Sequence, residues 1–236
     1  MKHLNLILII LILSCCPLHP AYAFFDKDIR LLTMRDGLAD NTIPCIYKDE
    51  DGFMWFGTDD GLSRYDGKTI QNFKPADTYA SVAAIVRLSD DFLGIVSDGY
   101  LYYFNRKQET FLPIHTESDT AIGVFNVLPA DNSSFWGISG NRLILCQWEI
   151  RQGKEEEKTA VRVRIQKTFQ LLEEKGEVFS SLCYHEKAGN GIWLTTNRGN
   201  LILFHPDTPE AYQKIPLTDG KPLQVTSILN RDGVVW

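Results

Sequence analysis

The side chains that most often carry acid–base chemistry are scattered along this chain. His115, His185 and His205 stand far apart, without a Ser-His-Asp frame or an H-x-x-x-H spacing around them. The adjacent acids Asp59-Asp60 and Asp90-Asp91 fall in stretches typical of turns, where Asp is an ordinary residue. The sequence therefore predicts no catalytic residues in this chain.

Metal and cofactor sites also lack their usual spacing. Outside the first 23 residues the cysteines are Cys45, Cys146 and Cys183; no two have C-x-x-C spacing, and no His stands at a metal-ligand interval from them. We expect small buried thiols instead. The chain has no phosphate-binding glycine loop and no kinase motif. We therefore expect no cofactor and no metal.

The composition favours an acidic globular protein. The 236 residues are 44% hydrophobic and 11% aromatic, which is enough for a sizeable core. The net charge of -6 argues against a face that binds nucleic acid.

Residues 1–23 resemble an export signal. A weakly basic start is followed by an almost unbroken apolar run over residues 4–13 and by the small-residue pattern Ala21-Tyr22-Ala23. The run is short for a membrane span. We expect export with cleavage after Ala23; the alternatives are an uncleaved N-terminal anchor and lipid attachment at Cys15 or Cys16.

The elements that would position any functional side chain are clearest in residues 51–67. Asp51-Gly52, Asp60-Gly61 and Asp66-Gly67 are three hairpin-turn signals around two short aromatic strands. Trp55 and Gly57 would share one face of the first strand, and Thr58 would lie on the other. A single hairpin cannot bury such faces, so the rest of the chain must supply partners.

The same layout recurs along the chain. The positions equivalent to Trp55 are Leu93, Trp136, Trp193 and Trp236, with gaps of 38, 43, 57 and 43 residues. Six residues after an anchor stands the turn glycine, at Gly61, Gly99 and Gly199; the third copy has Gly140 four residues after its anchor instead. A period of about 40 residues with four strands per unit predicts a β-propeller.

We therefore expect an all-β chain of four-stranded antiparallel blades, about four blades and the start of a fifth, in an incomplete ring. After the signal peptide of residues 1–23, the partial propeller would occupy residues 24–236. The blade repeats would cover about 41–75, 82–115, 124–170, 178–216 and 225–236. Residues 29–34 would form a strand that closes the ring. The long third repeat would be an extended outer hairpin with Arg162 and Arg164 on a solvated edge that blocks unwanted pairing, or, as the alternative, on a face for an anion.

The pattern Trp55-x-Gly57-Thr58-x-x-Gly61-Leu62-x-Arg64-Tyr65 resembles the two-component regulator propeller repeat, and residues 34–41 resemble the lead-in to its first copy. The repeat-motif positions in this chain are Trp55, Gly57, Thr58, Gly61, Leu62, Tyr65, Trp136, Trp193, Gly199 and Trp236. We expect these residues to have structural roles, with the tryptophans packed between blades. Thr195 replaces the motif glycine in the fourth copy.

The resemblance implies a periplasmic sensor of the hybrid two-component systems that are abundant in gut Bacteroidetes. Such a sensor detects glycan-derived oligosaccharides and signals to a histidine kinase and response regulator. The chain stops within a repeat, so we expect it to be the N-terminal fragment of a longer protein that also contains the remaining blades and the kinase. We expect this fragment to be poorly soluble alone. The full-length protein would form a homodimer. No nucleic acid is expected to bind this segment.

Ligand contacts would come from loops at one mouth of the ring. The candidate stretches precede the inner strands, at residues 36–41, 77–81, 117–121 and 219–222. Two alternatives differ in class. An exported propeller enzyme of the streptogramin-lyase type has a similar Gly-x-x-Trp signature but needs an acid–base His on a mouth loop, and a protein-interaction propeller needs none.

Overall fold

The structure is a computed structural model that describes residues 29–74, 80–151, 160–184, 191–218, 225, 228, 230–231 and 234–235. The chain divides into two units, Met1–Leu32 and Thr33–Trp236, and the sheets all belong to the second. The proposed leader (residues 1–23), His185 and Trp236 lie outside the described residues.

The first sheet is the four-stranded antiparallel blade expected for about residues 41–75. Its strands are β1 (Cys45–Lys48), β2 (Met54–Thr58), β3 (Gly61–Tyr65) and β4 (Ile70–Phe73), hydrogen-bonded in that order. Gly61 opens β3 at φ +116°, and a Cβ there would lie 2.6 Å from the carbonyl oxygen of Phe73. Only glycine tolerates both the dihedral and the close approach, which explains the turn residue of the motif.

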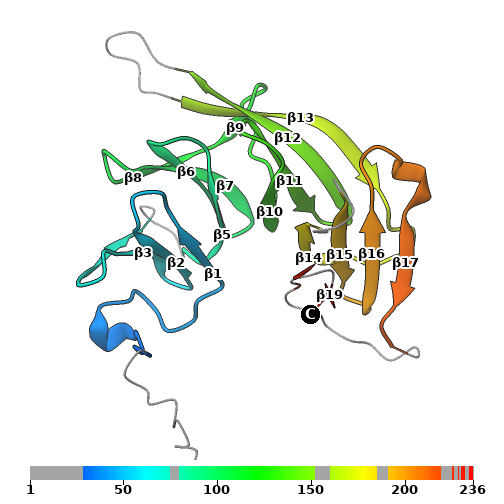
Figure 1. The fold of residues 1–236 in the computed structure, drawn as a ribbon. Coiled ribbons are helices and arrows are strands. Elements are labelled where there is room, and N and C mark those ends of the chain that lie inside the picture. Colours follow the sequence, from blue (N-terminus) through cyan, green and yellow to red (C-terminus); the bar gives the residue numbers. More distant parts are fainter. Residues whose placement is uncertain are drawn as a thin grey trace, which may run out of the picture. The chain divides into compact units, whose positions relative to one another are not determined.

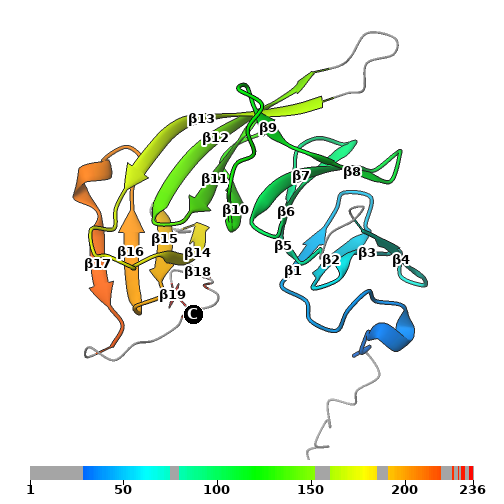
Figure 2. The same ribbon diagram turned by 180° about the vertical axis from the view of Figure 1, so that it is seen from behind.

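Three further sheets repeat this order (Figures 1 and 2). The second contains β5 (Val82–Arg87), β6 (Phe92–Ser97), β7 (Tyr100–Asn105) and β8 (Thr110–Pro113). The third contains β10 (Asn126–Pro129), β11 (Ser134–Ser139), β12 (Arg142–Arg151) and β13 (Ala160–Gln170), with β9 (His115–Thr116) at its edge. The fourth contains β14 (Phe179–Tyr184), β15 (Ile192–Thr196), β16 (Asn200–Phe204) and β17 (Gln213–Pro216). The short strands β18 (Asn230–Arg231) and β19 (Val234–Val235) pair with each other, and the described helices are single 3-10 turns, Met34–Asp36 and Pro209–Ala211.

The sheets pack face to face in sequence order, and their inner strands β1, β5, β10 and β14 are successive neighbours. Between the first two sheets lies a core that includes Trp55, Leu62 and Phe104. Equivalent cores lie between the second and third sheets and between the third and fourth. This is the architecture of a β-propeller, and the four described blades do not close a ring.

The prediction of a strand at residues 29–34 was wrong. Residues 29–33 form no regular structure, and Met34–Asp36 is a 3-10 turn. Thr33 caps this turn: its hydroxyl accepts from the backbone of Arg35 at 3.2 Å, and its own N–H donates to the Asp36 carboxylate at 2.9 Å. These side chains satisfy backbone groups that a strand would have to pair with a neighbour, so the local sequence favours the turn.

The outer hairpin of the third blade is long, as expected, but its edge is not simply solvated. β9 lies parallel to β13, with His115 opposite Arg162 and Thr116 opposite Val163. The expectation of an open basic edge is therefore corrected for the first residues of β13. The reason lies in residues 117–121, whose carboxylates reach the same arginines.

Candidate functional site at the turn end of the blades

One end of each sheet carries the segment that enters the inner strand and the turn between the second and third strands. We call this the turn end; its turns are residues 58–61, 97–100, 139–142 and 196–200. In a propeller, such loops meet at one mouth of the ring, where ligands usually bind. The turn end is therefore the place to seek a binding site.

Backbone hydrogen bonds tie each entering segment to a turn. Within blades, Asp59 N–H donates to Thr42 O at 3.3 Å, Asp98 N–H to Ser81 O at 3.2 Å and Asn197 N–H to Val178 O at 3.0 Å. Between blades, Val124 N–H donates to Gly99 O at 2.7 Å and Phe179 N–H to Gly140 O at 3.4 Å. Gly99 and Gly140 thus offer their carbonyl groups to the entering segment of the next blade and help to position it on the sheets.

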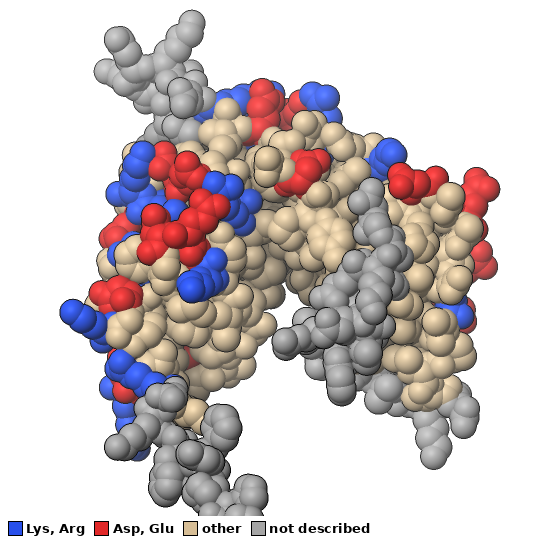
Figure 3. Space-filling model, in the orientation of Figure 1, with Lys and Arg blue, Asp and Glu red and all other residues tan. Residues whose placement is uncertain are grey.

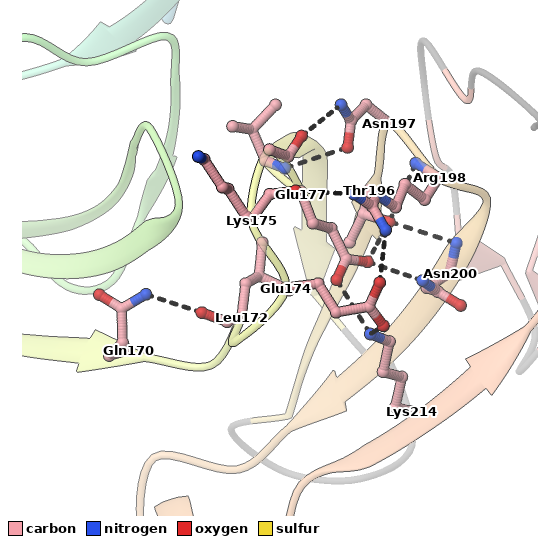
Figure 4. Close-up of polar contacts among 12 residues, drawn as sticks. Gln170, Leu172, Glu174, Lys175, Glu177, Thr196, Asn197, Arg198, Asn200 and Lys214 are labelled. Atoms are coloured by element: carbon pink, nitrogen blue, oxygen red, sulfur yellow. Dashed lines mark hydrogen bonds and ion pairs between the residues drawn. The ribbon is translucent and has the colours of Figure 1, made fainter.

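In the fourth blade, a buried carboxylate holds the entering segment (Figure 4). The side chain of Glu177 is 0% exposed and accepts from Thr196 Oγ1 at 2.8 Å, Asn200 Nδ2 at 2.6 Å and Lys214 Nζ at 2.9 Å. Burial alone would raise the pKa of Glu177, but the hydrogen bonds from Lys214, Asn200 and Thr196 outweigh it and hold this pKa below its ordinary value. The carboxylate is therefore ionised and joins the entering segment to β15, β16 and β17.

The rest of this segment is fixed by the turn itself. Asn197 donates its amide to Gly176 O at 3.1 Å and accepts from the backbone of Val178 at 3.0 Å. Arg198 bonds to the carbonyl oxygen of Lys175 at 2.7 Å and pairs with the Glu174 carboxylate. These bonds fix the loop on the turn, with the charge of Arg198 paired with that of Glu174.

In the first blade, hydrogen bonds between uncharged groups hold the entering segment. The Ala39 N–H donates to Ser63 Oγ at 3.2 Å, Ser63 Oγ donates to Asn72 Oδ1 at 2.7 Å, and Asn72 Nδ2 donates to Gly37 O at 2.9 Å. Thr58 Oγ1 closes the turn by donating to Gly61 O at 2.9 Å. The candidate stretch at residues 36–41 is therefore held firmly at the turn end.

Of the other candidate stretches, one is held at β13 and two lie wholly or mostly outside the described residues. Residues 117–121 are held at β13 by ion pairs, Asp119 with Arg162 at 2.6 Å and Glu117 with Arg164 at 2.7 Å. The hydrogen bonds from these arginines lower the pKa values of both carboxyl groups. Residues 77–79 and 219–222 lie outside the described part of the chain.

The repeat-motif tryptophans that the structure describes lie inside the stack of sheets. Trp55 is fully buried, its ring centroid 6.0 Å from that of Phe73 and 5.6 Å from that of Phe104. Trp136 contacts the rings of Phe169 and Phe204, and Trp193 packs in a cluster with Leu201, Leu203 and Ile228. None of these three is placed to stack on a ligand from solvent.

Sequence reasoning missed Asp49, which is buried at the opposite end of the first two blades. Its carboxylate accepts from Trp55 Nε1 at 2.7 Å, from Phe53 N at 2.8 Å and from Arg106 at 3.0 Å. It borders a pocket of about 400 Å³ that also includes Tyr47, Arg87 and Asp90, in a region where acidic and basic side chains gather (Figure 3). Because Arg106 comes from the second blade, this network joins two blades; nothing local in the sequence marks Asp49 as buried.

The described histidines are not at the turn end. His115 lies in β9 with Nδ1 3.0 Å from Asp119 Oδ1, beside the outer strand β13. His205 follows the end of β16, which is the end away from the turns. Within the described ranges, no group of three or more His, Cys, Asp or Glu residues could hold a metal ion, and no helix has the length and hydropathy needed to cross a membrane.

Comparison with known proteins agrees with this geometry. Residues 37–60 match the family model described as "Two component regulator propeller". The match covers the entering segment, β1, β2 and the start of the turn, which are the parts that the hydrogen bonds above hold together. No curated protein matches the chain.

Solved structures with this fold include the extracellular domain of a hybrid two-component system from B. thetaiotaomicron (TM-score 0.54, 16% identity, 88% of this chain and 33% of that chain). Virginiamycin B lyase from Staphylococcus aureus is similar (TM-score 0.53, 13% identity, 81% of this chain and 61% of the lyase). So is the WD40 propeller domain of Doa1 (TM-score 0.57, 10% identity, 82% of this chain and 59% of that domain). The chain spans about a third of the first structure and about three-fifths of the others. At these identities the likeness establishes the propeller fold alone.

Proposed function

We propose that this chain is an extracytoplasmic, ligand-sensing propeller segment of a hybrid two-component regulator. The observation that carries the proposal is the regulator propeller repeat at residues 37–60, set within a propeller blade. A propeller of this kind acts by binding and by transmitting a conformational change, so this segment performs no reaction.

The proposed ligand is a glycan-derived oligosaccharide, bound by loops at the turn end. One feature supports this place. The entering segments are pre-organised by the hydrogen bonds of Gly99, Gly140 and Glu177, and pre-organised loops lose little entropy on binding. A sensor needs no catalytic group there, since it needs only to bind the ligand differently in its two states.

The partners follow from the same proposal. Export would use residues 1–23, with cleavage after Ala23, and would place the propeller in the periplasm. The signal would pass through further blades to a histidine kinase and response regulator, in a full-length protein that forms a homodimer. This segment would bind no nucleic acid.

A binding experiment tests the proposal. Because the segment is expected to be poorly soluble alone, the whole chain is expressed with its leader and with a soluble carrier protein fused to its C-terminus, and the exported fusion is applied to immobilised gluco-, manno-, xylo- and galacto-oligosaccharides. We expect selective capture by one of these sugar classes and a mature N-terminus at Phe24. Failure of the exported chain to bind any glycan would contradict the ligand, and a cytoplasmic product would contradict the location.

A further inference from the structure

Phe125 is an exposed aromatic side chain at the turn end. It lies immediately before β10, the inner strand of the third blade, and it is 61% exposed. The described tryptophans of the repeat motif, Trp55, Trp136 and Trp193, are buried, so this ring departs from the way the chain uses those aromatic residues. Single exposed apolar residues are common on protein surfaces, and the case for Phe125 rests on how it is held.

The backbone on both sides of this ring is fixed. Phe125 N–H donates to Ile138 O at 2.9 Å within its own blade, and Val124 N–H donates to Gly99 O at 2.7 Å in the second blade. Val124 itself is fully buried. The exposed ring therefore stands on a segment that two blades hold in place.

The ring is seated against the bare backbone of Gly99. A Cβ at Gly99 would lie 3.3 Å from Phe125 Cε1, and Gly99 has φ +78°. The turn glycine thus serves two purposes here: it allows the left-handed turn, and it lets the ring approach the main chain. One edge of the ring is supported while more than half of the side chain faces solvent.

The residues on either side of Gly99 in the sequence carry polar side chains. Asp98, the residue before Gly99, is exposed, and its backbone N–H is held by Ser81 O at 3.2 Å. Tyr100, the residue after Gly99, is 49% exposed and forms a bridge with Gly123. A carboxylate accepts hydrogen bonds only, and a phenol both donates and accepts them. Together these two groups suit a ligand that carries several hydroxyl groups.

We propose that Phe125 is the stacking platform for one sugar ring of an oligosaccharide, with Asp98 accepting hydrogen bonds from its hydroxyls. The C–H face of a pyranose is apolar and its rim is polar, which matches a supported aromatic face beside a carboxylate. The inference rests on the proposed function and gives it a contact residue.

The test uses the same exported fusion of this chain and the same four oligosaccharide classes. Phe125→Ala should weaken capture of the preferred sugar by at least about tenfold, since it removes a ring whose burial the complex gains. Phe125→Trp should retain capture. Ile165→Ala provides the matched control: Ile165 is 44% exposed on β13 of the same sheet, and its loss should leave capture unchanged.

The outcomes separate the two proposals. If Phe125→Ala binds as the wild type does, while the wild type is captured selectively, the platform is wrong and the sensor proposal stands. If the wild-type chain captures none of the sugars, both are overturned. Equal urea midpoints for wild type and Phe125→Ala exclude unfolding as the cause of weaker capture.

Discussion

Gly57 lies where the first two blades pack closely, and replacing it with Ala should destabilise the chain. A Cβ at Gly57 would collide with Cys45 Sγ and would lie 2.5 Å from Val82 O and 2.8 Å from Val82 Cγ1. Cys45 belongs to β1 of the same blade, whereas Val82 begins the inner strand β5 of the next. The substitution would therefore push β2 of the first blade away from β5 of the second.

The magnitude follows from two opposing effects. Overpacking a tight contact costs about 1–3 kcal/mol, and we expect the upper end because one of the colliding atoms is a backbone carbonyl oxygen that cannot rotate away. Ala in place of Gly in a strand recovers about 0.5–1 kcal/mol through chain entropy. The net loss in free energy of unfolding should be about 2 kcal/mol.

Gly123→Ala is the matched control. A Cβ at Gly123 would have as its nearest neighbour the carbonyl oxygen of Gly99 at 3.8 Å, an ordinary contact. Its effect on the free energy of unfolding should stay within about 0.5 kcal/mol. Both substitutions add one methyl group, so they differ only in the room available.

Pulse proteolysis of the whole chain across a urea series measures the difference in cell extract. With an m-value of about 2 kcal/mol per molar urea, Gly57→Ala should lower the urea midpoint by about 1 M. A midpoint equal to that of Gly123→Ala would refute the close blade contact on which the packing argument depends.

Three further predictions concern buried polar groups and thiols. Glu177→Gln should lower the free energy of unfolding by about 1–3 kcal/mol at neutral pH. The folded pKa of Glu177 lies below the ordinary 4.5. This loss of stability relative to wild type should therefore have its full size above about pH 4.5 and should disappear as the pH falls through the folded pKa. A difference that stays constant down to low pH would contradict this. Asp49→Ala should cost about 3 kcal/mol in urea unfolding, since Trp55 Nε1 is left buried without its acceptor; an unchanged midpoint would show that the bond is unimportant. Burial raises the pKa values of the Cys45 and Cys146 thiols to about 12, so iodoacetamide at pH 8 should label them only after unfolding, and rapid labelling of the native chain would be inconsistent with their burial.

The blade architecture could be predicted because its signals are local. Trp55 and the turn at Asp60-Gly61 specify one hairpin, and the recurrence of that pattern at Trp136 and Trp193 specifies the stack of sheets. Gly61 at φ +116° and the alternation of side chains between the two faces of a strand are short-range features, so one sequence is enough to predict them.

The remaining features depend on contacts between distant residues. β9 pairs with β13 across 47 residues at its first pair, His115 with Arg162, and neither segment alone indicates this partner. Glu177 looks like an ordinary loop acid in the sequence, yet it is buried because Lys214 and Asn200 from later strands reach it. Phe125 shows the converse: an aromatic residue beside a buried valine suggests core, and only the packing of two blades leaves it exposed.

The central claim is that this chain senses a glycan outside the cytoplasm, and transcription in the organism that encodes it tests this most directly. The gene is deleted, and transcripts are measured after transfer from glucose to each of a set of purified polysaccharides. The account predicts that induction by one polysaccharide class is lost and that the wild-type gene restores it. Unchanged induction by every polysaccharide in the deletion strain would contradict the account.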